Sequence, residues 1–79
     1  MTGPIGVLAD DLTGAGDAAL AFHQAGFSTE IASWGVRRPA GKPRVWVLDT
    51  ASRGLSGPAA RRRVREAVRL LKGWIFSSF

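Results

Sequence analysis

Apolar residues come in short blocks along this chain, and their spacing changes from one block to the next. Residues 5–9 form a continuous apolar run, which predicts a buried parallel strand. Residues 14–25 predict a helix that stops at Gly26, because apolar side chains recur there at helical spacing. These side chains are Ala18, Ala21, Phe22 and Ala25. Residues 27–34 alternate and include β-branched and aromatic side chains, so they predict a second strand.

The second half of the chain continues the same alternation. After a loop rich in glycine, proline and basic residues at 35–43, residues 44–48 predict a third buried strand. Residues 57–73, bounded by glycines, predict a second helix with Pro58 in its first turn, where a missing N–H costs little. Its expected buried stripe consists of Val64, Val68 and Leu71. Residues 74–79 predict the start of a further strand.

This β-α-β-β-α-β order predicts an α/β fold, in which helices cover both faces of a parallel sheet in three layers, as in Rossmann-like domains. A chain of 79 residues buries only about 60 to 65% of its unfolded surface and is marginally stable alone. The last predicted strand is also still running at residue 79, so we expect residues 1–79 to be an incomplete part of a larger domain. The unfinished sheet edge, with Trp74, Ile75 and Phe76 exposed, predicts self-association.

Composition narrows the chemistry that the chain can support. The chain has no cysteine and one histidine, His23, which excludes disulfides and sulfur-based zinc sites and leaves oxygen ligands for any metal. No apolar run approaches the roughly 20 residues of a membrane span, and no apolar leader follows Met1, so we expect a cytoplasmic protein that does not enter membranes. The net charge of +5 comes from residues 61–72, which have few side chains for reading or stacking bases, so we expect no nucleic-acid partner.

Charged and hydroxyl side chains follow two of the predicted strands directly. Asp10 and Asp11 come after the first strand, and Ser52 and Arg53 come after the third. The carboxyl ends of parallel strands share one edge of the sheet, where ligands bind in such folds. We therefore expect these four side chains to face one crevice.

The side chains expected in this crevice suit a polyhydroxylated acid. Arg53 offers a planar fork for a carboxylate, and the hydroxyls of Thr13 and Ser52 can bond to sugar hydroxyls. Residues 14–17 are expected to lend backbone N–H groups to an anion at the start of the helix. An ionised aspartate accepts bonds from hydroxyls and can act as general base on one of them.

Structural roles compete with these functional ones. One of Asp10 and Asp11 can cap the helix, and Asp17 can favour the helix dipole from the first turn. Arg53 can lie on the surface and pair with Asp49. The sequence GAGDAA also fits a loose dinucleotide pattern, but two aspartates precede the glycines and the second strand ends without an acid, which argues against that site.

Two stretches, ADDLTGAGDAA at residues 9–19 and LDTASRGL at residues 48–55, resemble the two leading motifs of the four-carbon acid sugar kinase family. The resemblance implies an ATP-dependent kinase acting on threonate, erythronate or 3-oxo-tetronate. It further implies an N-terminal domain that holds the sugar acid and a separate C-terminal domain that holds ATP with Mg²⁺. Asp11 is the candidate catalytic base. The positions that match the family's substrate-binding motifs are Asp10, Asp11, Thr13, Gly14, Asp17, Ser52 and Arg53.

The family's remaining parts do not appear in these 79 residues, so we expect this chain alone to be inactive. Two alternatives stay open. The glycines also resemble the GAGD motif of ribokinase-like sugar kinases, in which the aspartate is the catalytic base. The chain can also be a non-catalytic α/β binding module that uses its basic helix against an acidic partner.

Overall fold

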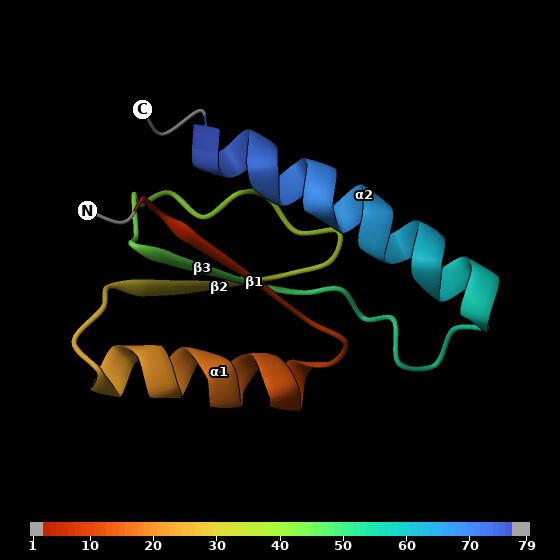
Figure 1. The fold of residues 1–79 in the computed structure, drawn as a ribbon, viewed down its shortest axis with the longest axis horizontal. Coiled ribbons are helices and arrows are strands. Elements are labelled where there is room, and N and C mark those ends of the chain that lie inside the picture. Colours follow the sequence, from red (N-terminus) through yellow and green to blue (C-terminus); the bar gives the residue numbers. More distant parts are fainter. Residues whose placement is uncertain (1–2, 77–79) are drawn as a thin grey trace.

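The computed structural model describes residues 3–76, which form three strands and two helices (Figure 1). The order along the chain is β1 (Ile5–Ala9), α1 (Leu12–Gln24), β2 (Thr29–Ser33), β3 (Val45–Asp49) and α2 (Gly57–Phe76). The three strands lie where the apolar runs predicted them, to within a residue or two at each end. Within residues 3–76, neither helix is long and apolar enough to cross a membrane.

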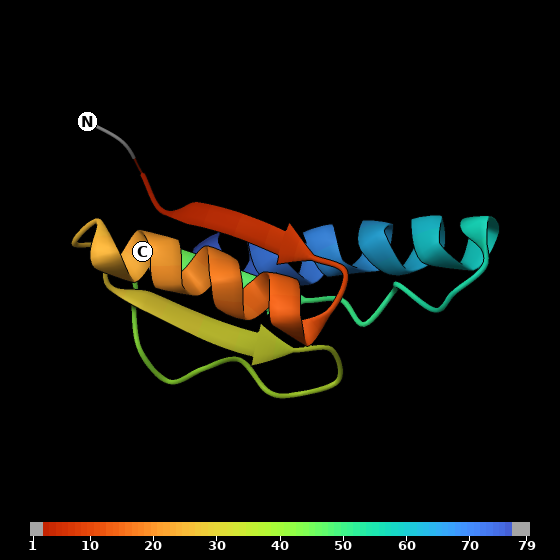
Figure 2. The same ribbon diagram turned by 90° about the horizontal axis from the view of Figure 1, so that it is seen from below.

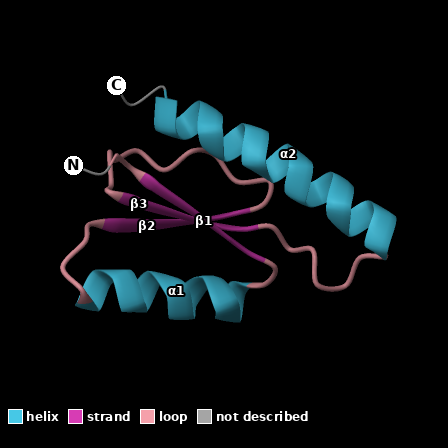
Figure 3. Ribbon diagram, viewed as in Figure 1, coloured by secondary structure: helices cyan, strands magenta, loops and turns pink. Residues whose placement is uncertain are grey.

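The strands form one parallel sheet in the order β1-β3-β2, with β3 in the centre. Figure 2 shows the arrows of β1 and β2 pointing the same way, and α1 lies on one face of the sheet while α2 lies on the other (Figures 1 and 3). All five residues of β3 are buried, as expected for a central strand covered on both faces. The predicted three-layer α/β fold is therefore confirmed.

Alternate residues of β3 pack toward α1 on one face of the sheet and toward α2 on the other. Val45 and Val47 pack against Ala15 and Ala19 of α1. On the other face, side chains from β2, β3 and α2 form the second core, namely Ala32, Trp46, Leu48, Ala67, Leu71 and Trp74. Alternation along the strand thus divides one short apolar run between two cores.

The backbone of β1 lies very close to α2 at Gly6. A methyl group in place of a hydrogen on Gly6 would lie 2.8 Å from Cδ2 of Leu71 and 3.3 Å from Cδ1 of Ile75. The absence of a side chain at Gly6 is therefore what lets α2 pack directly on the strand.

Helix α2 differs from the prediction in its buried face and its end. Val64 is exposed and Val68 is half-buried, while Ala67, Leu71 and Trp74 form the buried stripe. The helix continues past Gly73 to Phe76, so the predicted strand at 74–79 and the β-α-β-β-α-β order are wrong for residues 74–76; residues 77–79 lie outside the described residues.

The reason for the longer helix is tertiary packing. Trp74 is buried, with its ring centroid 6.0 Å from that of Trp46, so continuing the helix covers a large aromatic side chain. The expectation that Trp74 is exposed is therefore wrong, whereas Phe76 is 69% exposed.

Helix α1 begins at Leu12, two residues before the predicted start. Its buried residues are Ala15 and Ala19, while Ala21 and Ala25, two of the apolar residues whose spacing predicted the helix, are exposed. Gly26 adopts the expected left-handed conformation, with φ of 95°. The early start matters for the site, because it makes Asp11 the residue that caps the helix.

Candidate functional site

The loops that follow β1 and β3 are joined by backbone hydrogen bonds at the carboxyl edge of the sheet. The register pairs Ala9 with Asp49, so the two loops leave the sheet side by side. Thr50 donates its backbone N–H to the carbonyl of Ala9 at 2.8 Å. Ser52 and Arg53 both donate backbone N–H groups to the carbonyl of Asp10, at 3.0 and 3.2 Å. The second loop is therefore anchored on the first.

Asp11 is the N-cap of α1. It has an extended backbone, and its Oδ1 accepts the N–H of Gly14 at 2.7 Å while its carbonyl accepts the N–H of Ala15 at 3.0 Å. The prediction that one of the two aspartates caps the helix is confirmed. The N–H of Gly14 is thus already engaged, contrary to our expectation that the glycines offer free donors, and the helix start leaves the N–H groups of Leu12 and Thr13 without intrahelical acceptors.

Arg53 contacts both aspartates. Its Nη1 lies 2.7 Å from Oδ2 of Asp11, its Nη2 lies 3.4 Å from Oδ1 of Asp10, and its Nε lies 3.4 Å from Oδ2 of Asp10. The expected convergence of the two loops is therefore present, and the alternative pairing of Arg53 with Asp49 is not what the structure has. The Arg53 side chain is 70% exposed, so it is accessible to a ligand.

The buried hydroxyl groups of Thr50 and Ser52 stabilise the loop that follows β3. Their hydroxyl oxygens lie 2.8 Å apart, and both residues are buried. Because Thr50 donates its hydroxyl to the carbonyl of Ala9 at 3.1 Å, the Ser52 hydroxyl is the donor in the pair. In this conformation Ser52 stabilises the loop rather than facing solvent.

Thr13 and Asp17 follow this cluster along α1. Both are exposed, and both lie on the same side of the helix because they are four residues apart. Asp17 is in the second turn, so the expectation of a first-turn dipole interaction is wrong. The structure therefore brings Asp10, Asp11 and Arg53 together, whereas Thr13 and Asp17 lie further along α1 on its exposed surface.

Comparison with known proteins identifies the domain family of the chain that contains this cluster. Residues 5–77 match the family described as the sugar-binding N-terminal domain. The chain belongs to this family. The motif-based resemblance to the four-carbon acid sugar kinases is thereby confirmed. The match covers both loops of the site and both helices.

A curated relative extends this result. A D-threonate kinase from Bordetella bronchiseptica (strain ATCC BAA-588 / NCTC 13252 / RB50) is 38% identical over 78 residues, which cover 91% of this chain and 19% of the relative. The chain thus spans about a fifth of the length of the curated relative it matches. No solved structure matches the chain significantly.

Several residues that shape the site of this sugar-binding domain were missed by sequence reasoning. Oδ1 of Asp49 accepts the N–H of Ala51 at 2.8 Å, and Arg63 of α2 donates to the carbonyl of Thr50 at 2.9 Å. Asp49 and Thr50 belong to the LDTASR motif, so that motif could have identified them as site residues. Nothing in the sequence separates Arg63 from its basic neighbours on the helix.

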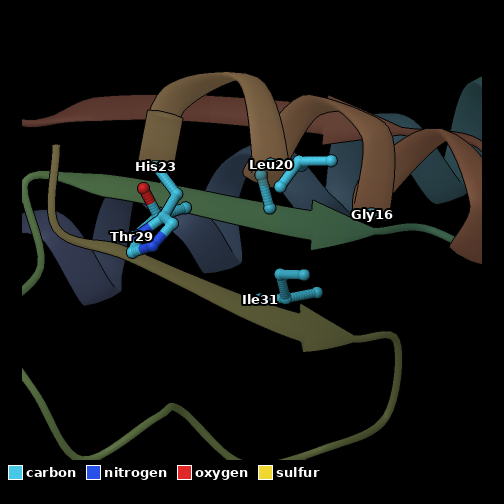
Figure 4. Close-up of a pocket in the computed structure, with 6 residues that line it drawn as sticks. Gly16, Leu20, His23, Thr29 and Ile31 are labelled. Carbon is cyan, nitrogen blue, oxygen red and sulfur yellow. The ribbon is translucent and has the colours of Figure 1, made fainter. Parts of the chain in front are cut away.

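Metal centres and pockets are two other places where a ligand can bind. Residues 3–76 contain no group of three or more histidine, cysteine or acidic side chains that could hold a metal ion. A shallow groove lies between α1 and β2 (Figure 4). Its lining residues are Gly16, Ala19, Leu20, His23, Thr29 and Ile31, and they include no carboxylate.

Proposed function

We propose that this chain is the acceptor-binding part of an ATP-dependent kinase that phosphorylates a four-carbon sugar acid such as threonate, erythronate or 3-oxo-tetronate. Membership of the sugar-binding family and the similarity to a D-threonate kinase support the substrate class. The proposal rests on the contact of Arg53 with both Asp10 and Asp11. This contact places a group that binds carboxylates beside two groups that accept hydrogen bonds from hydroxyls. Residues 1–79 are then the incomplete N-terminal part of the sugar-acid domain.

Binding in this proposal is an exchange of carboxylates on Arg53. The guanidinium binds Asp11 and Asp10 when no ligand is present. A sugar-acid carboxylate takes the place of these partners in a charge-assisted bidentate contact. Oδ2 of Asp11 is then released and accepts a hydrogen bond from a substrate hydroxyl, while Oδ1 stays on the helix cap.

The same released oxygen is where a general base is needed. As the substrate hydroxyl oxygen attacks the γ-phosphorus of ATP, its proton passes to Oδ2 of Asp11 and ADP leaves. A positioned base contributes about 10² to 10⁴-fold to such a step, and the remainder comes from positioning and charge neutralisation. Asp10, Thr13 and Asp17 complete the proposed substrate-binding set with their side chains. Gly14 and Ser52 support this set indirectly, because Gly14 holds Oδ1 of Asp11 and Ser52 holds the loop that carries Arg53.

ATP and Mg²⁺ do not fit the donor groups of this chain. The sequence has no Gly-Lys-Ser/Thr phosphate loop, and the described residues offer no metal-ligand cluster. We propose that a separate C-terminal domain, outside residues 1–79, holds both, and that this chain alone has no kinase activity. We also propose that the intact protein works in the cytoplasm, where ATP is available as the phosphate donor.

Calorimetric titration of the 79-residue chain tests the proposal. D-threonate and D-erythronate should bind saturably, whereas D-threitol, which keeps the hydroxyls but lacks the carboxylate, should bind at least tenfold more weakly. Equal affinity for acid and polyol, or no binding of either acid, would contradict the proposal. Steeply salt-dependent binding to nucleic acid or an acidic protein would instead favour the non-catalytic module.

A further inference from the structure

Arg63 is set apart from the other basic residues of α2 by what it touches. Its Nη1 donates to the carbonyl of Thr50 at 2.9 Å and lies 3.4 Å from the carbonyl of Ala51. Its guanidinium also lies over the ring of Trp34, at 4.8 Å from the centroid. The side chain therefore connects α2 to the residue after β2 and to the loop after β3.

The turn that Arg63 holds has an unfavourable backbone. Ala51 has φ of 52°, in the left-handed region that favours glycine, and such a residue costs about 1–2 kcal/mol. Oδ1 of Asp49 holds the Ala51 N–H from one side, and Arg63 holds the two carbonyls from the other. The neighbouring side chain of Asp49 and the distant side chain of Arg63 thus offset the strain at Ala51.

The consequence of this turn falls on Arg53. Ser52 and Arg53 follow Ala51 directly and donate both of their N–H groups to the carbonyl of Asp10. If the backbone at Ala51 relaxed to a right-handed conformation, the chain would leave the turn in another direction. The Arg53 side chain would then lose its position between Asp10 and Asp11.

From these contacts we infer that Arg63, stacked on Trp34, is a positioning residue for the sugar-acid site. It fixes the left-handed turn at Ala51 and thereby the direction of Arg53, without itself contacting the ligand. The inference rests on the proposed function of Arg53. Arg63 is half-buried at this contact, whereas Arg61, Arg62 and Arg65 are exposed on the same helix.

The guanidinium is well suited to this role and an ammonium group is not. Arginine has several donors in a rigid plane, so it can donate to a carbonyl from its edge while its face stacks on a ring. Lysine can do one of these but not both in the same geometry. Arg63→Lys should therefore fail to restore what Arg63→Gln loses, although it keeps the charge.

The test compares Arg63→Gln and Arg63→Lys with Arg62→Gln. Arg62 is a neighbouring exposed arginine, so its variant is the matched control. In amide NMR spectra of the unliganded 79-residue chain, both Arg63 variants should shift the signals of Ala51, Ser52 and the Arg53 side-chain Nε–Hε. Titration with D-threonate should show an affinity loss of about tenfold, as expected when Arg53 occupies its binding position in only about a tenth of the molecules. Arg62→Gln should leave the signals and the affinity unchanged.

A second substitution separates positioning from direct contact. Glycine adopts the left-handed conformation without the steric cost, so Ala51→Gly added to Arg63→Gln should recover most of the lost affinity. An absence of recovery would mean that Arg63 touches the ligand itself, and the inference would be wrong. It would also be wrong if the Arg63 variants kept the wild-type Arg53 signals. Failure of the wild-type chain to bind D-threonate would count against the proposed function, while the unliganded spectra would still decide the role of Arg63.

Discussion

Replacing Arg53 with alanine should separate the stability of this domain from its binding of a sugar acid. The Arg53 side chain is 70% exposed, and its partners Asp10 and Asp11 are 53% and 26% exposed. Exposed ion pairs are screened by solvent and contribute about 0.2–1 kcal/mol. The backbone bond from Arg53 to Asp10 does not depend on the side chain. The free energy of unfolding should therefore fall by less than about 1 kcal/mol.

Binding should respond far more strongly than stability. A hydrogen bond to a charged group contributes about 1.5–3 kcal/mol, which corresponds to about a 10- to 150-fold increase in the Kd for D-threonate. Arg53→Lys, which keeps the charge but loses the planar fork, should fall between wild type and Arg53→Ala. Urea denaturation and calorimetric titration of the same samples measure the two quantities.

Arg69→Ala is the matched control, because it removes one exposed arginine from α2. It should change neither quantity measurably. The reasoning would be refuted if Arg53→Ala kept the wild-type Kd. It would also be refuted if Arg53→Ala and Arg69→Ala weakened binding equally, since the effect would then come from net charge.

Two further substitutions test the helix start and the packing of α2. Asp11→Ala removes the cap on Gly14 and should lower the free energy of unfolding by about 1 kcal/mol. Asp11→Asn should keep most of the wild-type stability, because asparagine also caps helices. Equal losses for the two variants in urea denaturation would count against the cap. Gly6→Ala should destabilise by about 1–3 kcal/mol through its contact with Leu71, while Gly16→Ala, which meets no atom within 4 Å, should stabilise by about 0.5–1 kcal/mol. A Gly6→Ala variant as stable as wild type in thermal melts would show that α2 can move away.

The fold could be predicted to the extent that it depends on local pattern. The apolar runs of β1 and β3 located the strands, and their alternation with helices predicted the parallel sheet. The end of α2 could not be predicted, because Gly73 is a local stop signal that the packing of Trp74 on Trp46 overrides. The start of α1 was placed two residues late, at Gly14, because the apolar residues at helical spacing come after it, whereas the cap at Asp11 begins the helix at Leu12.

The candidate site was predictable for the same topological reason. Parallel strands deliver their following loops to one edge, and that was enough to bring Asp11 and Arg53 together. The role of Arg63 was not predictable, since it depends on the rotation of α2 about its axis and on a strained turn at Ala51. The buried position of Ser52, whose hydroxyl bonds to Thr50 instead of facing solvent, was likewise not predictable.

Mapping the amide and Arg53 Nε–Hε signals of the 79-residue chain during titration with D-threonate tests the central claim most directly. If the loops after β1 and β3 form one site for a sugar acid, the largest shifts should fall together on residues 10–14 and 50–53. Shifts centred on the groove at His23 and Thr29, or shifts on only one of the two loops, would contradict that claim.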